Sequence, residues 1–225
     1  MKFYIVNASP RKNYNTSKLL DKVAEGIKDT VSDKVSDDEV IIKVIDLYSL
    51  NYTGCKSCFL CKQENGPFYG TCPVNDDIKD IIADMHSCDG IVFGSPVYFA
   101  DINGMLRSFI ERLCFPQYPY ADIDITEKRM PTGIIYDMNI KEDNPSMPFY
   151  NSVFDFLEEM FIARVFTKPY SLKVYNTYQF DDYSKYVNTW FDEEDKRQQR
   201  ETQFPKDLEE AYNMGVNIAI DSLKK

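Results

Sequence analysis

The chain opens with a short apolar run, Phe3 to Val6, which is broken at Ser9-Pro10 and followed by a helical pattern. From near Thr16 onward, apolar residues recur at the spacing of an amphipathic helix. The loop between strand and helix is rich in hydroxyl, amide and basic groups. It ends at a helix N-terminus, where free backbone N–H groups and the positive end of the helix dipole favour a phosphate. A strand, a polar turn and a helix in this order therefore predict a phosphate-binding loop.

This loop lacks the glycine-rich fingerprints of dinucleotide and nucleoside-triphosphate sites, G-x-G-x-x-G and G-x-x-x-x-G-K-[ST]. A hydroxyl-rich loop is instead typical of a site for the phosphate of flavin mononucleotide (FMN). Taken alone, the loop fits an ordinary N-capped helix after a strand equally well. The other loops of the chain decide between these two interpretations.

Composition and charge narrow the class of protein. The 225 residues, 44% of them hydrophobic, suit one domain with additions and a sizeable core. A formal net charge of -10 argues against nucleic acid or an anionic membrane as a general partner. The first apolar run is too short for a signal peptide and no segment is long enough to span a bilayer, so we expect a cytoplasmic protein. With His86 as the one histidine, most His-based hydrolases and His-rich metal sites are excluded.

Apolar runs and helical patterns alternate along the chain, which predicts a doubly wound α/β domain with a parallel sheet and right-handed crossovers. The five expected strands are residues 3–6, 40–45, 90–93, 132–136 and 172–175. The expected helices begin near 16 and 103 and cover about 76–85, 149–161 and 205–223.

The parallel arrangement brings distant loops together. Loops that follow parallel strands leave the sheet at one edge, and ligands of such folds bind there. We therefore expect residues 9–17, 55–72, 95–100 and 137–139 to line one shared cleft.

The third of these loops, Gly94 to Gly104, suits a flavin ring. Pro96 stiffens the turn, and Tyr98 or Phe99 offers a flat apolar face. Backbone donors at the pyrimidine edge of the ring would stabilise the charge that builds there on reduction. The alternative is that the two aromatic side chains merely cover the end of the sheet.

Together these motifs resemble a known family. The run Ser9-Pro10-Arg11 with Asn15-Thr16-Ser17, and Gly94-Ser95-Pro96-Val97-Tyr98-Phe99 before a helix carrying Arg107 to Arg112, is similar to the flavodoxin-like NAD(P)H-dependent FMN reductases. The segment Gly54 to Cys61 and the late stretch Asn176 to Tyr186 resemble the cysteine-bearing "multimeric flavodoxin" branch. The resemblance thus covers nearly the whole chain.

The resemblance implies a flavodoxin-like three-layer sandwich, with a five-stranded parallel sheet in order 2-1-3-4-5 and helices on both faces. Carried over by position, it implies that the FMN phosphate is bound by Ser9, Arg11, Asn15, Thr16 and Ser17. It implies that the isoalloxazine ring contacts Pro96, Val97, Tyr98 and Phe99. Asp137, in the loop after the fourth strand, completes the expected cofactor-binding set.

The reaction of this family is hydride transfer from a nicotinamide to the flavin, then onward to a second acceptor such as a quinone or a flavin. Because the flavin carries that chemistry, no catalytic residue is assigned. A homodimer or higher homo-oligomer is the family's usual state. Two alternatives of other classes stay open: an electron carrier that oxidises no nicotinamide, and an α/β interaction module without a ligand.

The cysteines allow several sites. Cys55, Cys58 and Cys61 form C-x2-C-x2-C, and Cys72-Pro73 follows after ten residues. The first spacings and the Cys-Pro ending resemble a ferredoxin run, and related iron-sulfur flavoproteins bind a [4Fe-4S] cluster, although the last gap is longer here. Zinc, unligated thiols and a Cys58–Cys61 redox pair are the alternatives.

Four further features have structural interpretations. Cys88 and Cys114 lie in apolar patterns that predict buried small hydrophobes. His86 is expected to cap a helix C-terminus as a cation rather than to act in catalysis. Asp76-Asp77 are expected as an N-cap and a first-turn charge. The mixed charges of residues 192–200 predict a solvated helix face.

One segment falls outside the minimal fold. Residues 176–204 are rich in aromatic side chains, more than a free linker would tolerate, so we expect them to pack against something. The hypothesis is that this extension forms a dimer contact or a lid over the flavin of a neighbouring subunit. The chain is otherwise expected to be one domain over residues 1–225.

Overall fold

The computed structural model describes residues 1–32, 34–35, 39–126 and 128–224. Within these residues, five strands pair in parallel in the order β2-β1-β3-β5-β6. Their bounds are β1 (Lys2–Asn7), β2 (Ile41–Asp46), β3 (Gly90–Tyr98), β5 (Thr132–Asp137) and β6 (Tyr170–Val174). Once the short β4 (Asp101–Ile102) is set aside, this is the predicted order, so the sheet prediction is confirmed.

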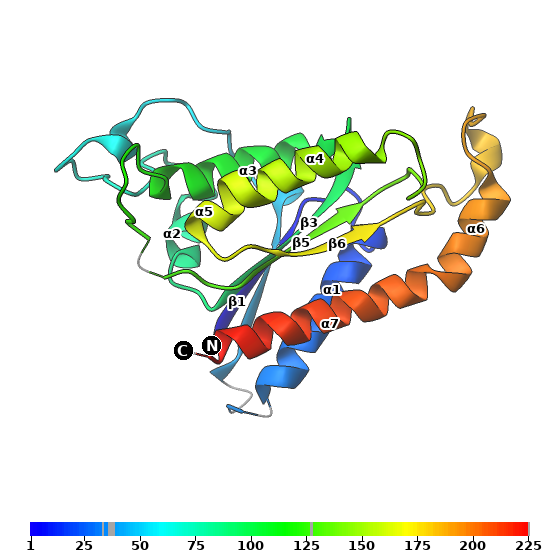
Figure 1. Ribbon diagram of the computed structural model, residues 1–225, viewed down its shortest axis with the longest axis horizontal. Coiled ribbons are helices and arrows are strands. Elements are labelled where there is room, and N and C mark those ends of the chain that lie inside the picture. Colours follow the sequence, from blue (N-terminus) through cyan, green and yellow to red (C-terminus); the bar gives the residue numbers. More distant parts are fainter. Residues whose placement is uncertain (33, 36–38, 127, 225) are drawn as a thin grey trace.

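Helices cover both faces of the sheet (Figure 1). One face carries α2 (Lys79–Met85), α3 (Gly104–Cys114) and α4 (Met147–Leu157), which continues through a π-helical turn (Glu158–Ile162) into α5 (Ala163–Val165). The other face carries α1 (Asn15–Ser32) and α7 (Phe204–Ser222), and α6 (Glu193–Thr202) precedes α7. Short 3₁₀ turns lie at Leu47–Ser49, Leu60–Lys62, Phe115–Gln117 and Tyr183–Lys185.

The central strands are apolar on both sides, which is why they lie inside the molecule. In β1, Tyr4 and Val6 pack into the core under α2, α3 and α4, whereas Phe3 and Ile5 pack into the core under α1 and α7. All four side chains are buried. Near-continuous apolar runs of this kind are typical of parallel strands covered on both faces.

Helices α1 and α7 cross in close contact. A Cβ atom on Gly26 would lie 2.2 Å from the backbone oxygen of Tyr212, and one on Gly215 would lie 2.2 Å from that of Val23. Both glycines therefore serve a close approach of two backbones rather than a turn. This contact fixes the start of α1, which is the start of the predicted phosphate site, relative to the rest of the sandwich.

Strand β3 is longer than the sequence predicts. It was expected to end at Phe93, before Gly94-Ser95-Pro96, but Gly94 and Pro96 pair with Ile135 and Asp137 of β5 and carry the strand on to Tyr98. Phe99 and Ala100 then both take positive φ (51° and 66°), and the chain reverses into β4. The proline is tolerated because it lies at the end of the ladder, opposite the last residue of β5.

The predictions for the start of α2 are wrong. The helix begins at Lys79, and neither aspartate caps it. Asp76 instead accepts hydrogen bonds from the guanidinium of Arg112, and Asp77 accepts the backbone N–H of Asn51. Contacts with distant residues therefore override the local capping pattern.

His86 is not a cationic cap either. Its backbone N–H closes the last turn of α2, but the ring is buried and stacks on Phe166 with centroids 6.1 Å apart. Burial lowers the pKa of His86 to about 4, so the imidazole is neutral at pH 7. Cys88 and Cys114 are buried, as predicted.

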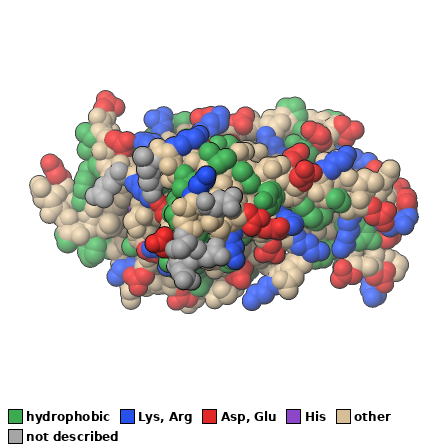
Figure 2. All heavy atoms as spheres, turned by 90° about the horizontal axis from the view of Figure 1, so that it is seen from below, with side chains coloured by type: hydrophobic (Ala, Val, Ile, Leu, Met, Phe, Trp, Pro, Cys, Tyr) green, Lys and Arg blue, Asp and Glu red, His purple; other side chains and the backbone are tan. Residues whose placement is uncertain are grey.

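The surface over α1 and α7 carries acidic and basic side chains intermixed (Figure 2). Helix α6 is mostly exposed, as predicted, but Lys196 on it is buried. Asp192 caps its N-terminus by accepting the Asp195 N–H. None of the helices in the described ranges is long and apolar enough to cross a membrane.

Candidate functional site

The loops that follow β1, β3, β5 and β6 meet at the carboxyl edge of the sheet, next to α6 (Figure 1). They enclose a cavity of about 50 Å³. The predicted convergence of residues 9–17, 95–100 and 137–139 is thus present, with a fourth loop added. The lining residues are Ser9, Arg11, Tyr14, Pro96, Val97, Tyr98, Asp137, Asn139, Thr177 and Gln179.

The loop after β1 is held by its own polar side chains. The Ser9 N–H donates to Asn7 Oδ1 at 3.0 Å, and the Arg11 N–H donates to Ser9 Oγ at 3.2 Å. The Arg11 guanidinium lies 3.9 Å over the Tyr14 ring and donates to the carbonyl of Gln179. The arginine therefore joins the predicted phosphate loop to the start of the aromatic extension.

The first turn of α1 brings the remaining predicted residues to the same place. Asn15 Nδ2 donates to the Tyr178 carbonyl at 2.9 Å, and Thr16 Oγ1 donates to Asp137 Oδ2 at 2.8 Å. Ser17 Oγ accepts from Asn7 Nδ2 at 3.1 Å. The five predicted phosphate residues thus surround one helix N-terminus.

The turn after β3 is fixed by a residue that the sequence analysis missed. Asn103 caps α3 by accepting the Leu106 N–H at 3.0 Å, and its amide donates to the carbonyl of Ala8. Its backbone N–H also donates to Ser95 Oγ at 3.1 Å. The buried Asn103 therefore locks the first and third loops together, and its place before a helix was the one local signal for it.

Of the four residues predicted to contact the isoalloxazine ring, three lie at the cavity and one does not. Pro96, Val97 and Tyr98 line the cavity. Phe99 does not: it stands at the tip of the β3–β4 hairpin with its side chain entirely exposed (105%). A planar ligand at this edge would therefore meet Tyr98 before Phe99.

Two buried ionisable groups lie beside the cavity. Asp137 is 9% exposed, its Oδ1 has no hydrogen-bond partner in the described structure, and burial raises its pKa. Lys196 Nζ donates to Asn139 O, Asn176 Oδ1 and Thr177 O at 3.0 to 3.2 Å. Burial lowers the pKa of Lys196 to about 8.

The sequence analysis did not assign Tyr14, Thr177, Gln179 or Lys196 to this site. The last three lie in the aromatic extension, whose first residues pack onto the phosphate loop of the same chain. The aromatic residues of the extension predicted that it packs against something, but they did not show that it packs against the phosphate loop.

A family model described as NADPH-dependent FMN reductase matches residues 1–127. The chain belongs to the NADPH-dependent FMN reductase family. The family predicted from the loops is therefore confirmed.

Two archaeal proteins are similar to this chain in sequence. An iron-sulfur flavoprotein of Methanocaldococcus jannaschii is 30% identical over 112 residues, which cover 50% of this chain and 51% of that protein. An iron-sulfur flavoprotein of Archaeoglobus fulgidus is 34% identical over 112 residues, covering 50% and 48%. The chain spans about half the length of the curated relatives it matches.

Solved structures extend the likeness to nearly the whole chain. An NAD(P)H:quinone oxidoreductase from Methanothermobacter marburgensis has a TM-score of 0.65 at 13% identity, covering 97% of this chain and 96% of that one. An FMN-dependent NADH-azoreductase from Bacillus anthracis, solved in complex with FMN, has a TM-score of 0.64 at 14% identity, covering 97% and 100%. These comparisons confirm the flavodoxin-like fold.

The cysteine segment does not join this site, so the prediction that residues 55–72 line the shared cleft is wrong. The segment runs along α3 toward its C-terminal end, where the Cys55 N–H donates to Glu111 Oε2 at 3.1 Å. Arg112 is almost completely buried (1% exposed) and donates through Nε to Cys72 Sγ at 2.9 Å and through both terminal nitrogens to Asp76. This guanidinium holds the segment against the helix.

The four cysteines differ in exposure and do not fit a four-thiolate site as they stand. Cys55 and Cys58 are exposed, Cys61 is buried and Cys72 is half-buried. Among the described residues, no three Cys, His, Asp or Glu side chains are grouped as a metal ion requires. In the described part of the chain, these four thiols therefore do not form a ready site for an iron-sulfur cluster or zinc.

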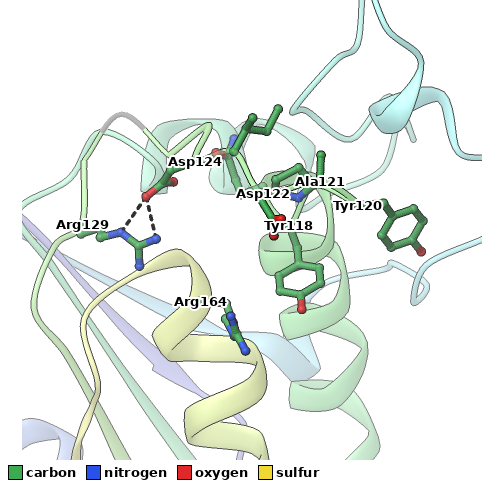
Figure 3. A pocket seen from close by; sticks show the side chains of 10 residues that line it. Tyr118, Tyr120, Ala121, Asp122, Asp124, Arg129 and Arg164 are labelled. Atoms are coloured by element: carbon green, nitrogen blue, oxygen red, sulfur yellow. Dashed lines mark hydrogen bonds and ion pairs between the residues drawn. The ribbon is translucent and has the colours of Figure 1, made fainter.

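Larger cavities lie beyond the C-terminal end of α3. One, of about 610 Å³, lies between residues 117–124 and the side chains of Arg129 and Arg164, with Arg129 paired to Asp124 (Figure 3). Another, of about 530 Å³, lies beside Cys55 and Phe59. None of the residues that end β1, β3 or β5 lines either one, so these two larger cavities do not coincide with the predicted cofactor-binding residues.

Proposed function

We propose that this chain binds FMN non-covalently at the carboxyl edge of its sheet and passes a hydride from NAD(P)H through the flavin to a small acceptor such as a quinone or a free flavin. The observation that carries the proposal is the meeting of the α1 N-terminus, Arg11 and the β3 turn around one cavity. Helix N-termini with free N–H groups bind phosphate, and the family description names FMN.

The residues present fit the cofactor. Asp137 Oδ1 and Tyr14 Oη are buried polar atoms without a hydrogen-bond partner in the described structure, both at the cavity. Ser9, Arg11 and the first turn of α1 would hold the phosphate. Pro96, Val97 and Tyr98 would lie along the ring. The flavin supplies the hydride acceptor, so this chain has to bind, orient and shield it rather than supply an acid or base.

Binding requires the extension to move. Ligand cavities usually measure roughly 300 to 1,000 Å³, and the cavity here is about 50 Å³. The contacts from Arg11 to Gln179 and from Asn15 to Tyr178 close it. We propose that both side chains exchange these carbonyls for phosphate oxygens when FMN enters.

The test is a stopped-flow experiment on the FMN-loaded chain. NADPH or NADH is expected to bleach the bound flavin, and a quinone is expected to restore its colour over many cycles. A chain that does not retain FMN, or whose flavin neither nucleotide reduces, would contradict the proposal.

The alternative is an electron carrier that oxidises no nicotinamide. The iron-sulfur flavoprotein relatives favour it. It predicts slow or absent bleaching by NADPH but rapid reduction by a low-potential donor such as dithionite. Anaerobic iron analysis of the same preparation decides whether the cysteine segment rearranges to hold a cluster.

The remaining expectations about this oxidoreductase stay predictions. We propose a single domain over the whole chain, a cytoplasmic setting, a homodimer, and neither nucleic acid nor a membrane as partner. The extension contacts its own phosphate loop, and a lid over a neighbouring subunit would use the exposed side chains of Tyr186, Val187 and Trp190 instead.

A further inference from the structure

The carboxyl group of Asp137 lies where the phosphate is expected. Asp137 ends β5, and its Oδ2 accepts the hydroxyl of Thr16, the second residue of α1. Its Oδ1 is buried at the cavity without a hydrogen-bond partner in the described structure. With FMN bound, this helix N-terminus would therefore face two acid groups, the FMN phosphate and the carboxyl group of Asp137.

The charged groups around Asp137 do not neutralise it directly. Arg11 faces it from the β1–α1 loop, Lys196 from α6 and Asp207 from α7. Arg11 is bound to Gln179 and Tyr14, and Lys196 donates to three oxygens of other residues. Within the described residues, neither cation forms an ion pair with Asp137 at 4.0 Å or less.

A buried carboxylate and a phosphate dianion in contact repel each other strongly. Two acids that share a site hold one proton between them, because a second negative charge beside the first is disfavoured. The second pKa of a phosphate monoester such as that of FMN is about 6. Arg11 and the helix N-terminus would stabilise the charged phosphate, whereas burial without an ion partner disfavours the charged form of Asp137, so above that pH the carboxyl group is the one that takes the proton.

We propose that Asp137 takes up a proton from solvent when FMN binds, and that the neutral acid then donates a hydrogen bond from Oδ1 to a phosphate oxygen. This inference rests on the proposed FMN site and adds a specific role for one of its residues. Asp137 is a binding residue that becomes protonated when FMN binds, and the proton leaves again when FMN dissociates.

The sign of the pH dependence follows from this proton. Burial already raises the pKa of Asp137 in the free chain, and the phosphate raises it further. The complex then binds more protons than the free chain, so the affinity for FMN falls as the pH rises. The fall is up to about tenfold per pH unit while one proton is taken up.

The experiment is calorimetric titration of the whole chain with FMN, between about pH 7 and 9 where the free phosphate is a dianion, in buffers of different ionisation enthalpy. We expect uptake of close to one proton per FMN in the wild type. Riboflavin, which lacks the phosphate, is expected to bind without uptake. Asp137→Asn is expected to take up none and to bind FMN roughly tenfold or more tightly than the wild type at the upper end of this range.

Asp207→Asn is the matched control. Asp207 is also a buried aspartate with an unpartnered oxygen in the described structure and a pKa raised by burial to about 6, but it does not line the flavin cavity. This variant is expected to keep the proton uptake of the wild type.

Two other results overturn the inference in different ways. FMN binding without proton uptake, or equal uptake with riboflavin or by Asp137→Asn, overturns the role of Asp137 and leaves the FMN site intact. Failure of the wild type to bind FMN overturns the site itself. If Asp137→Asn does not fold, the comparison of FMN with riboflavin in the wild type still decides.

Discussion

Two long polar loops leave the carboxyl ends of neighbouring strands and end in different places. The loop after β1 turns directly into α1 and stays at the carboxyl edge of the sheet, hereafter the rim, where it meets the turns after β3 and β5. The loop after β2 travels along α3 and is anchored at the far end by Arg112. The contrast teaches that parallel topology determines where a loop starts, whereas buried contacts determine where a long loop goes.

The largest expected effect belongs to the anchor of the cysteine segment. Arg112→Met removes the cation that pairs with Asp76 and holds Cys72, and breaking a buried pair in this way costs about 3–5 kcal/mol. Urea unfolding of the FMN-free chain measures the loss. FMN affinity is expected to change by less than about twofold, because distant sites act independently.

Arg197→Met serves as the control for this anchor. Its ion pair with Glu194 is exposed on α6, so the unfolding free energy is expected to change by less than about 1 kcal/mol. If Arg112→Met were no more destabilising than this control, Arg112 would not anchor the segment.

The second effect is a loss of folding stability at acid pH, which arises at the end of α2, away from the rim. The pKa of His86 is about 4 in the folded chain and about 6.5 when unfolded, so the unfolded state binds the proton more tightly. The stability from neutral His86 is complete above about pH 6.5 and is lost as the pH falls toward 4, by up to about 3 kcal/mol. His86→Phe is expected to flatten this part of the stability–pH curve.

Urea midpoints at a series of pH values compare His86→Phe with the wild type. Parallel curves for the two proteins between pH 6.5 and 4 would show that His86 is not the group responsible.

The third effect is confined to the rim. Arg11→Ala removes the one charged side chain of the β1–α1 loop that lines the cavity, and a hydrogen bond to a charged group is worth about 1.5–3 kcal/mol. FMN affinity is therefore expected to fall roughly tenfold to a hundredfold, measured by quenching of flavin fluorescence. Lys18→Ala removes an exposed cation near the start of α1 and should bind like the wild type. Equal losses in both variants would indicate a general charge effect.

The smallest effect concerns the thiols. Iodoacetamide is expected to modify Cys55 and Cys58 quickly, whereas the buried Cys61, Cys88 and Cys114 react slowly. Peptide mass spectrometry gives the order. FMN affinity should be unchanged after the exposed thiols react, and a loss of flavin at that stage would place the segment at the rim after all.

The sequence predicted the parts of this molecule that repeat a simple rule. Strands such as β1 and β5 are apolar on both faces, so their number could be inferred, and the loops after them meet because the strands are parallel. The order of the strands came from the family resemblance. Family motifs added the residue roles at the rim. The predicted phosphate residues all lie there, although Phe99 points away.

The remaining features depend on contacts between residues far apart in the chain. Pro96 suggests the end of a strand, but pairing with β5 carries the strand past it. Asp76 looks like a helix cap, but the guanidinium of Arg112 binds it. The aromatic extension shows no periodicity that would place Thr177 and Gln179 at the cavity. No local pattern contains these pairings, which is why sequence reasoning missed them.

The most direct test of the central claim is a titration of the ¹⁵N-labelled chain with FMN, followed by backbone amide shifts. The site at the rim predicts that the shifted amides gather in residues 9–17, 96–98, 137–139 and 176–179, with residues 55–72 unaffected. Shifts gathered in residues 55–72 or around Arg129 and Arg164, with the β1–α1 loop unchanged, would contradict it.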